Sequence, residues 1–311
     1  MTAATARLAD RLGSLVRRDV PLGPLTTYRV GGPAALLAKV ADIDEMRSVA
    51  HAVAGTGVAT LVIGRGSNLL VADDGFDGLA LVLGDGFSAV EINGTTVAAG
   101  GAASLPVVAR RTAKAGLTGF EWAVGVPGSV GGAVRMNAGG HGSDMAATVR
   151  GIHVLDLATC EDGEVPVTDL AFGYRCSAIG PSQVVVRADL GLQPGEVTAA
   201  EAEISEIVRW RRAHQPGGTN AGSVFTNPPG DSAGRLVEVA GCKGLRVGTA
   251  EVSNKHDKFI QADDGGRAAD VAALMGEVRS RVATATGVNL HPETHLIWFP
   301  PRAHPQREVN V

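Results

Sequence analysis

The residues whose types and spacing are most suited to chemistry lie in a glycine-rich stretch, Gly119–Gly142, which reads GFEWAVGVPGSVGGAVRMNAGGHG. Glycine this dense costs backbone entropy on folding, so it is used where the chain needs a positive φ or where a ligand approaches the backbone closely. Without side chains in the way, successive N–H groups can turn inward and cradle an anion such as a diphosphate. The same pattern is typical of tight turns in a β-rich domain, and the stretch alone leaves both interpretations open.

A second glycine turn, Gly64-Arg65-Gly66-Ser67-Asn68, follows the short apolar run Thr60–Ile63. Gly-x-Gly-x-x-Gly does not occur in the longer glycine stretch between a predicted strand and a predicted helix. A Rossmann dinucleotide site is therefore disfavoured. No spacing of His, Asp and Glu residues indicates a metal site.

The composition describes a soluble globular chain. Its 311 residues, with 45% hydrophobic and 19% charged residues, suffice for two or three domains with their own cores. A net charge of −4 without a basic block excludes a nucleic-acid-binding surface. Cys160, Cys176 and Cys242 are widely separated and are interpreted as free thiols in a reducing compartment. The chain has no signal-like apolar segment and no run of about 18 apolar residues, so we expect a cytoplasmic protein without a membrane partner.

The elements that must position these turns alternate irregularly between helix and strand, which favours an α+β fold over a repeating βαβ sheet. Helices are predicted at 1–20, 42–54, 105–115, 198–214, 234–241 and 268–286, and strands at 60–63, 69–71, 79–83, 90–92, 95–98, 152–157, 184–190, 247–252, 259–260 and 296–299. Asp42, Ser104 and Thr198 are the predicted helix caps. Asn93-Gly94 is the strongest hairpin signal in the chain.

Composition shifts near residue 195, which places a domain boundary between Leu192 and Thr198. We expect an N-terminal helix and lead-in at 1–24, a first domain at 25–192, a second domain at 198–300 and a tail at 301–311.

Seven separate stretches, in order, resemble the UDP-N-acetylenolpyruvoylglucosamine reductase family, the flavoenzymes of peptidoglycan precursor synthesis. They are Thr27-Tyr-Arg-Val-Gly-Gly32, Ile63-Gly-Arg-Gly-Ser-Asn-Leu-Leu-Val71, Gly125-Val-Pro-Gly-Ser-Val-Gly-Gly132, Met136-Asn-Ala-Gly139, Phe172-Gly-Tyr-Arg-Cys-Ser177, Gly222-Ser-Val-Phe-Thr-Asn-Pro228 and Pro292-Glu293. The resemblance implies a PCMH-type FAD-binding region of two α+β subdomains at 25–192 and a C-terminal αβ substrate-binding domain at 198–300. The short, tyrosine-free chain at 184–209 resembles the branch that lacks an extra loop folding a Tyr over the substrate.

The resemblance also implies a reaction. NADPH reduces non-covalently bound FAD, and the reduced flavin then converts the enolpyruvyl ether of UDP-N-acetylglucosamine to UDP-N-acetylmuramate. Arg175 matches the family's catalytic arginine, whose forked guanidinium stabilises the enolate-like intermediate. Ser223 matches the proton donor, and Glu293 matches a third catalytic residue that orients Ser223 or relays a proton. By residue type alone, a structural arginine that caps strand ends is the weaker interpretation of Arg175. For Ser223 and Glu293, a turn serine and a surface glutamate are the favoured interpretations.

The binding residues that the resemblance implies fall into two sets. The FAD set consists of Arg29, Gly64, Arg65, Gly66, Ser67, Asn68, Gly125, Val126, Pro127, Gly128, Ser129, Gly131, Gly132, Asn137, Ala138 and Gly139, and the substrate set of Tyr174, Asn227, Lys255 and His256. His141 is interpreted as a turn residue, because this family does not attach its flavin covalently. We expect a sugar-nucleotide substrate, no nucleic acid, and a monomer or weak oligomer.

Four positions, at three places in the chain, depart from the family pattern. Thr226 stands where Lys or Arg is usual, Asp257-Lys258 replaces a small residue and an amide, and Thr26 replaces Asn. The missing cation at Thr226 can be supplied by Lys255, Lys258 or Arg235. A diverged flavoenzyme of the same fold acting on another sugar nucleotide is therefore an alternative. A non-catalytic flavin-binding module is a weaker one, because such a module has no need of the catalytic residues.

Overall fold

The computed structural model describes residues 1–299, and the predicted tail at 301–311 lies outside them. By packing, the chain divides into two units that are each discontinuous in sequence. Unit 1 comprises Met1–Val20, Ala35–Arg65 and Asp77–Ala213, and unit 2 comprises Pro21–Ala34, Gly66–Phe76 and the chain from His214 onward. The domain boundary expected between Leu192 and Thr198 stays a prediction. By packing, the chain passes from unit 1 to unit 2 after Ala213.

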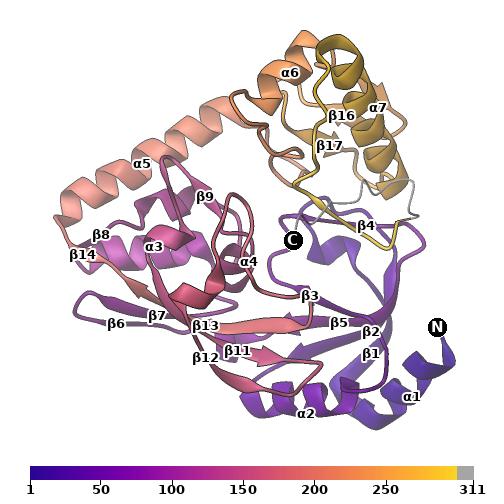
Figure 1. The fold of residues 1–311 in the computed structure, drawn as a ribbon, viewed down its shortest axis with the longest axis vertical. Coiled ribbons are helices and arrows are strands. Elements are labelled where there is room, and N and C mark those ends of the chain that lie inside the picture. Colours follow the sequence, from indigo (N-terminus) through magenta and orange to yellow (C-terminus); the bar gives the residue numbers. More distant parts are fainter. Residues whose placement is uncertain (300–311) are drawn as a thin grey trace. The chain divides into compact units, whose positions relative to one another are not determined.

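The first sheet of unit 1 has the strand order β1-β2-β5-β3. Its strands are β1 (Val16–Pro21), β2 (Pro33–Val40), β5 (Phe76–Leu83) and β3 (Thr60–Ile63), and β3 runs parallel to β5. Helices α1 (Ala3–Leu12) and α2 (Ile43–Val53) pack against it (Figure 1). Leu8, Met46 and Leu79 from these elements share one buried cluster.

The second sheet of unit 1 is antiparallel, with the order β12-β11-β13-β7-β6. Its strands are β12 (Asp162–Pro166), β11 (Val149–Asp156), β13 (Gln183–Gly191), β7 (Thr96–Gly100) and β6 (Val90–Asn93). One face packs on α3 (Leu105–Lys114) and α4 (Val130–Arg135), and residues of α5 (Val197–His214) belong to the same buried cluster. The predicted hairpin at Asn93-Gly94 is confirmed, since Asn93 pairs with Thr96. Two short antiparallel pairs complete the unit: β8 (Leu117–Thr118) with the distant β14 (Gln193–Pro194), and the hairpin of β9 (Gly139–Gly140) and β10 (Ser143–Asp144).

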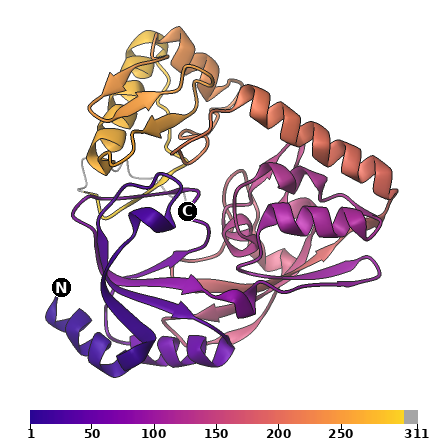
Figure 2. The same cartoon turned by 180° about the vertical axis from the view of Figure 1, so that it is seen from behind.

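Unit 2 contains a three-stranded antiparallel sheet, β15 (Arg246–Val247), β16 (Ala250–Val252) and β17 (Ile260–Ala262). Helices α6 (Ala233–Val239) and α7 (Ala268–Thr286) pack against this sheet, which Figure 2 shows from behind in orange to yellow. A parallel pair joins β18 (His295–Ile297) to β4 (Leu69–Val71). Because β4 pairs with the end of the chain, the segment 66–76 belongs to this unit.

Several predicted elements are confirmed. Helix α7 has the predicted bounds, and α2 begins after Asp42, whose carboxylate accepts hydrogen bonds from the N–H groups of Asp44 (3.0 Å) and Glu45 (2.9 Å). Glu45 reaches back to the N–H of Ala41 at 2.7 Å, which is the capping-box arrangement displaced by one residue. The three cysteines carry free thiols, as predicted. No helix within residues 1–299 is long and apolar enough to cross a lipid bilayer.

Other predicted elements are wrong in extent. The helix expected over 1–20 ends at Leu12, and Gly13, at φ +52°, leads the chain into strand β1. The strand expected over 247–252 is a hairpin, because Gly248 turns the chain at φ +52° between β15 and β16. Thr198 lies inside α5 instead of capping it, and Ser104 precedes α3 without a side-chain capping bond. Helix α4 was not predicted.

Candidate active site

Two of the predicted FAD segments meet in unit 1, where the turn after β3 lies against the start of α4. A Cβ atom on Gly64 would lie 2.3 Å from the Oγ of buried Ser129, so a larger residue would require the serine hydroxyl to move. Gly131 donates its N–H to Gly101 O at 2.9 Å, and a Cβ there would lie 3.2 Å from the same oxygen. Part of the glycine pattern therefore serves close approach of backbone segments.

The rest of the glycine stretch is an open turn. In the β9–β10 hairpin, a Cβ on Gly140 or Gly142 would meet nothing within 4 Å. His141 lies between them at φ +52°, which confirms it as a turn residue. Its ring contacts the edge of Trp210 on α5 at 5.2 Å between centroids, and burial, together with the charge of Arg211, lowers the pKa of His141.

The carboxamide of Asn137 ties the glycine stretch to the segment that carries Arg175. Its Nδ2 donates to Gly173 O (3.0 Å) and to Asp144 Oδ2 (3.2 Å), and its Oδ1 accepts from the N–H of Ala146 (3.0 Å). Asn137 is buried, with φ +38°. All of its hydrogen-bonding groups thus hold neighbouring segments, which gives this predicted FAD residue a structural role.

Arg175 occupies a two-residue turn between Gly173 and Cys176. The Gly173 N–H donates to Cys176 O at 3.0 Å, and the Cys176 N–H donates back at 3.3 Å. Arg175 has φ +57°, a conformation that the second central residue of a β-turn normally leaves to Gly or Asn. Its Nη2 donates to Gly139 O at 3.1 Å, and its guanidinium lies 5.5 Å from the ring centroid of Tyr174. A strained residue held by such contacts is typical of a functional position.

In unit 2, the chain that carries Ser223 lies beside the chain that carries Glu293. The Glu293 N–H donates to Val224 O at 2.8 Å, and Phe225 forms a β-bridge with Pro292. On its other side, the Val224 N–H donates to Lys258 O at 2.9 Å. Ser223 and Glu293 are both half-buried. The two residues are thus held on adjacent, hydrogen-bonded segments.

Asn68, from the other end of the predicted FAD turn, also contacts this pair. Its Nδ2 donates to Glu293 O at 3.1 Å, and its own carbonyl accepts from the His295 N–H at 3.0 Å. These bonds continue the parallel pairing of β4 with β18 toward the candidate catalytic residue. The glycine turn therefore helps to place Glu293.

The change from Asn to Thr at position 26 is accommodated by the structure. Thr26 Oγ1 donates to Gly23 O at 3.0 Å and accepts from the Arg29 N–H at 3.2 Å, so the hydroxyl closes the local turn. Arg29 has φ +55° in this turn. The next residue, Thr27, donates its N–H to Gly66 O at 3.1 Å. Two predicted FAD residues, Arg29 and Gly66, are thus brought together.

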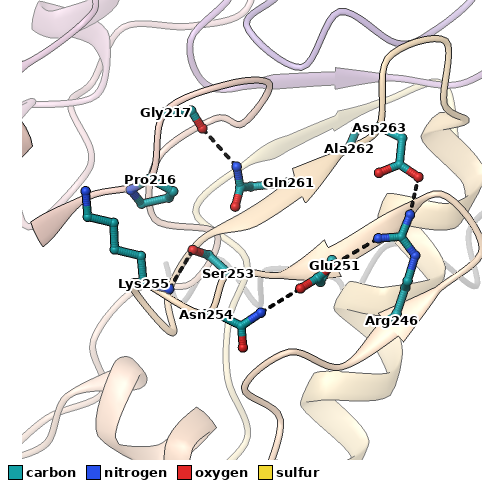
Figure 3. Close-up of a pocket in the computed structure, with 10 residues that line it drawn as sticks. All are labelled: Pro216, Gly217, Arg246, Glu251, Ser253, Asn254, Lys255, Gln261, Ala262 and Asp263. Atoms are coloured by element: carbon teal, nitrogen blue, oxygen red, sulfur yellow. Dashed lines mark hydrogen bonds and ion pairs between the residues drawn. The ribbon is translucent and has the colours of Figure 1, made fainter.

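Of the predicted substrate residues, Lys255 lines a polar cavity of about 450 Å³ on the open face of the β15–β17 sheet (Figure 3). Arg246 in this cavity is compensated by ion pairs with Glu251, at 2.9 Å, and with Asp263. Gln261 Nε2 donates to Gly217 O at 2.9 Å and closes one wall. The cavity offers many hydrogen-bonding groups and little net charge.

His256 follows Lys255 of this cavity lining, and its surroundings disfavour the charged ring. Burial and the positive charge of Lys258 lower its pKa. Its Nδ1 lies 3.3 Å from the Lys258 N–H and accepts that hydrogen, so Nε2 carries the ring hydrogen. The ring packs against Phe259 at 4.8 Å between centroids.

The replaced pair Asp257-Lys258 has partners of its own. Lys243 Nζ lies 3.7 Å from Asp257 Oδ1, and Lys258 Nζ donates to Asn227 Oδ1 at 2.5 Å. The sequence indicates Lys258 only as one of three residues that can replace the missing cation at Thr226. No periodic or motif signal in the sequence indicates that it contacts Asn227.

The structure therefore assembles the predicted residues in two groups. Unit 1 gathers Gly64, Arg65, the segment Gly125–Gly139, Tyr174 and Arg175; unit 2 gathers Arg29, Gly66–Asn68, Ser223, Asn227, Lys255, His256 and Glu293. Arg175 thus belongs to a different unit from Ser223 and Glu293. Among residues 1–299, no group of three His, Cys, Asp or Glu residues is arranged to hold a metal ion.

The residues in unit 1 fit a flavin nucleotide. The open backbone at Gly140 and Gly142 leaves space beside Gly139, and the cationic Arg175 contacts the same segment. Two buried polar atoms just before Gly125, Glu121 Oε1 and Trp122 Nε1, have no hydrogen-bond partner among the described residues. Open backbone, small side chains and polar atoms of this kind suit a ligand with both aromatic and phosphate parts.

Fold and site together define an FAD-binding protein, and an FAD binding domain family matches residues 34–169. The C-terminal domain of UDP-N-acetylenolpyruvoylglucosamine reductase matches residues 214–297. A reductase of this name from Symbiobacterium thermophilum is 41% identical over 94% of this chain and 99% of its own length. Another, from Anaeromyxobacter dehalogenans, is 42% identical over 94% of this chain and 89% of its own.

A solved structure agrees with these relatives. The crystal structure of UDP-N-acetylenolpyruvylglucosamine reductase from Thermus caldophilus superposes with a TM-score of 0.80 at 35% identity, covering 91% of this chain and 98% of that one. The chain belongs to the UDP-N-acetylenolpyruvoylglucosamine reductase family. The expected α+β fold with an FAD-binding region and a C-terminal domain is confirmed.

Proposed function

We propose that the protein is an FAD-dependent oxidoreductase that uses NADPH to reduce the enolpyruvyl ether of UDP-N-acetylglucosamine to UDP-N-acetylmuramate. The observation that carries this proposal is the 41% identity to a named reductase over 94% of the chain. The adjacent placement of the Ser223 and Glu293 segments supports it, because the reaction needs a proton donor with a positioned partner.

Bound FAD supplies the hydride in such a reaction. Hydride addition to the terminal vinyl carbon leaves negative charge beside the substrate carboxylate, and that charge needs a cation where it develops. Arg175 takes this role: its guanidinium is always charged, and its hydrogen bond to Gly139 O holds it at one place beside the glycine stretch. The predicted FAD segment Asn137–Gly139 supports this role, because Arg175 donates a hydrogen bond to Gly139 within that segment.

Ser223 then donates the proton. A serine hydroxyl is a poor acid in water, so the transfer requires a strongly basic carbon and a site from which water is excluded. Glu293 orients the Ser223 hydroxyl or returns a proton to it. Hydrogen bonds fix the Glu293 backbone to both Val224 and Asn68, which supports this role. Tyr174, Asn227, Lys255 and His256 hold the sugar nucleotide.

The test is anaerobic reduction of the FAD-loaded protein with NADPH, followed by UDP-N-acetylenolpyruvylglucosamine while flavin absorbance is recorded. Rapid reoxidation with formation of UDP-N-acetylmuramate is expected. In Ser223→Ala, reduction by NADPH persists and reoxidation by the substrate is lost, because only the second half-reaction needs the proton donor. Failure of the wild-type protein to be reoxidised contradicts the proposed substrate.

A diverged oxidoreductase acting on another sugar nucleotide is the second candidate, favoured by the changes at Thr226 and Asp257-Lys258. Reduction by NADPH followed by reoxidation with a different UDP-sugar would support it. We also propose that the protein is cytoplasmic, that it is a monomer or a weak oligomer, and that its partners are small molecules. Size-exclusion chromatography with light scattering tests the state of association.

A further inference from the structure

Residues 220–223 of unit 2 form a short loop between two anchored residues. Thr219 is anchored to β17, because its carbonyl accepts the Ala262 N–H at 3.0 Å and its Oγ1 donates to Ala262 O. Val224 is anchored by its N–H, which donates to Lys258 O at 2.9 Å. Within residues 1–299, no backbone–backbone hydrogen bond joins residues 220–223 to another segment. Ser223 therefore ends a loop that receives no support from a neighbouring strand.

The carboxamide of Asn220 supplies hydrogen bonds inside this loop. Its Oδ1 accepts the Gly222 N–H at 3.0 Å, and its Nδ2 donates to Gly217 O and Gly218 O, each at 3.3 Å. An Asn side chain bonded to the N–H two residues ahead closes an Asx turn. Gly217 O also accepts from Gln261 Nε2 at 2.9 Å (Figure 3), so Asn220 joins Gly222 to a carbonyl that is fixed to β17.

Gly222 has a backbone conformation that needs to be held. Its φ is +74°, and an added Cβ would meet nothing within 4 Å, so the conformation and not the space calls for glycine here. Glycine visits many conformations at little cost, and it therefore does not stay in one of them unaided. The bond from the Gly222 N–H to Asn220 Oδ1 selects one conformation, and the dihedral angles of Gly222 set the direction in which Ser223 follows.

The residues around Ser223 in sequence belong to the core of unit 2. Ala221 and Val224 are buried, with 6% and 1% of their surfaces exposed, and both lie in the same hydrophobic cluster. Ser223 is half-buried between them in sequence. The bonds of the Asn220 carboxamide all stay within residues 217–222 and join no two helices or strands. Losing them would therefore turn Ser223 relative to the core without removing a contact between elements.

We infer that Asn220 is a positioning residue for the proton donor: its Asx turn holds Gly222 and thereby aims the Ser223 hydroxyl at the carbon that accepts the proton. The inference rests on the proposed function, in which Ser223 donates that proton. In that step the Ser223 O–H bond breaks, a C–H bond forms beside the substrate carboxylate, and the serine oxygen regains a proton through Glu293. A weak acid such as serine must lie within hydrogen-bond reach of its acceptor, and a misplacement of about 1 Å costs up to about 100-fold in rate.

The experiment follows the two half-reactions of the FAD-loaded Asn220→Ala and Asn220→Ser variants under anaerobic conditions. In Asn220→Ala, we expect reoxidation by UDP-N-acetylenolpyruvylglucosamine to slow about 10- to 100-fold, with reduction by NADPH changed less than about twofold. Asn220→Ser keeps a side-chain oxygen that accepts the Gly222 N–H, and it should recover most of the lost rate. Equal reoxidation in the wild-type and Asn220→Ala proteins, or no recovery in Asn220→Ser, overturns the positioning role.

Asp156→Ala is the matched control, because Asp156 Oδ1 closes a turn of the same kind in unit 1 by accepting the Ala158 N–H at 2.8 Å. We expect similar small changes of Tm in the two alanine variants, whereas only Asn220→Ala slows reoxidation. The solvent deuterium isotope effect on reoxidation should increase in Asn220→Ala, because proton transfer then limits more of the rate. A merely structural role predicts a smaller reoxidation amplitude with an unchanged isotope effect, and that result would overturn the inference.

Hydrogen exchange of the Gly222 amide, measured by NMR on the FAD-loaded protein, distinguishes this inference from the proposed function. Exchange should be about 2- to 10-fold faster in Asn220→Ala, while the Val224 amide keeps its protection. If the enolpyruvyl substrate does not reoxidise the wild-type protein, the proposed reaction fails, and faster Gly222 exchange in Asn220→Ala still supports the placement of the Ser223 loop by Asn220. Unchanged Gly222 exchange overturns that placement, whichever substrate the enzyme uses.

Discussion

At the scale of single residues, the backbone conformation of Arg175 in the candidate site lowers the free energy of unfolding. Arg175 has φ +57°, where a Cβ atom crowds the following carbonyl at a cost of roughly 1–2 kcal/mol. Arg175→Gly and Arg175→Ala should both lose substrate-dependent flavin reoxidation. Arg175→Gly should be more stable than Arg175→Ala by about 1 kcal/mol, because glycine tolerates this φ. Urea unfolding measures the difference, and an alanine variant equal to or more stable than the glycine variant would contradict backbone strain at this residue.

The ion pairs around Asp162 give a residue-scale prediction about pH. Burial opposes ionisation of Asp162, but hydrogen bonds from His153 and Arg47 outweigh it and lower its pKa. A carboxyl with a lowered pKa in the folded state stabilises the protein above its unfolded pKa, and that contribution disappears as pH falls through the folded pKa. Asp162→Asn should therefore cost about 1 kcal/mol or less at pH 7, with the cost vanishing below about pH 4.

The control for this prediction is Asp10→Asn, which breaks a more exposed pair with Arg18. We expect a smaller loss of unfolding free energy in the control than in Asp162→Asn at pH 7. Denaturant unfolding midpoints of both variants and the wild-type protein, recorded from pH 3 to pH 8, measure these losses. A cost in Asp162→Asn that persists or grows as the pH falls from about 4 to 3 would contradict the predicted linkage.

At the scale of elements, helix α7 has a cap that comes from far along the chain. Arg267 precedes the helix, and its side chain offers no acceptor; Asp73 instead accepts hydrogen bonds from the N–H groups of Ala268 (2.8 Å) and Ala269 (3.0 Å). Asp73→Ala should destabilise the protein by about 1–2 kcal/mol through lost capping and helix-dipole interactions. Asp73→Asn, which keeps one acceptor oxygen, should lose about half as much. Equal losses in the two variants would contradict the two-oxygen cap.

The same helix shows what the sequence can and cannot predict. The bounds of α7 follow from its apolar periodicity, but its cap lies 195 residues away and has no local signal. Helix α4 was missed because Gly131 and Gly132 are poor helix formers, and tertiary contacts to the Gly101 segment compensate for them. The hairpin β15–β16 was read as one strand because Val247 and Val252 flank the turning Gly248 with strand-like residues.

The candidate site also has a part that the sequence predicts and a part that it does not. Motifs, which are local in sequence, predict the glycine segments and Arg175. The contacts that hold them are not local: Asn137 joins Gly173, and Asn68 joins Glu293, 225 residues away. The link from Lys258 to Asn227 likewise depends on tertiary pairing, with Lys258 O accepting from Val224. Motifs therefore predict which residues a site uses, whereas packing decides how each is oriented.

At the scale of the whole molecule, the core of unit 2 is completed by residues from the first quarter of the chain. Tyr28, Val30 and Leu70 share one buried cluster with Leu274 and Leu296, and both Tyr28 and Leu70 are fully buried. Burial raises the pKa of Tyr28, in keeping with a phenol that water does not reach. Strand β18 has its parallel partner in β4, at Leu70 and its neighbours.

A fragment that begins at Thr198 lacks these three side chains and this partner strand. Each missing large side chain removes about 2–5 kcal/mol from a core of this kind, and the sum approaches the whole stability of about 5–15 kcal/mol of a typical domain. We therefore expect the fragment to show no cooperative thermal unfolding and poorly dispersed amide resonances. The full chain with Leu70→Ala should still fold, with unfolding free energy lowered by about 2–5 kcal/mol. A fragment that unfolds cooperatively would instead establish the continuous C-terminal domain predicted from composition, and would mean that Tyr28 and Leu70 only cover a core that is complete without them.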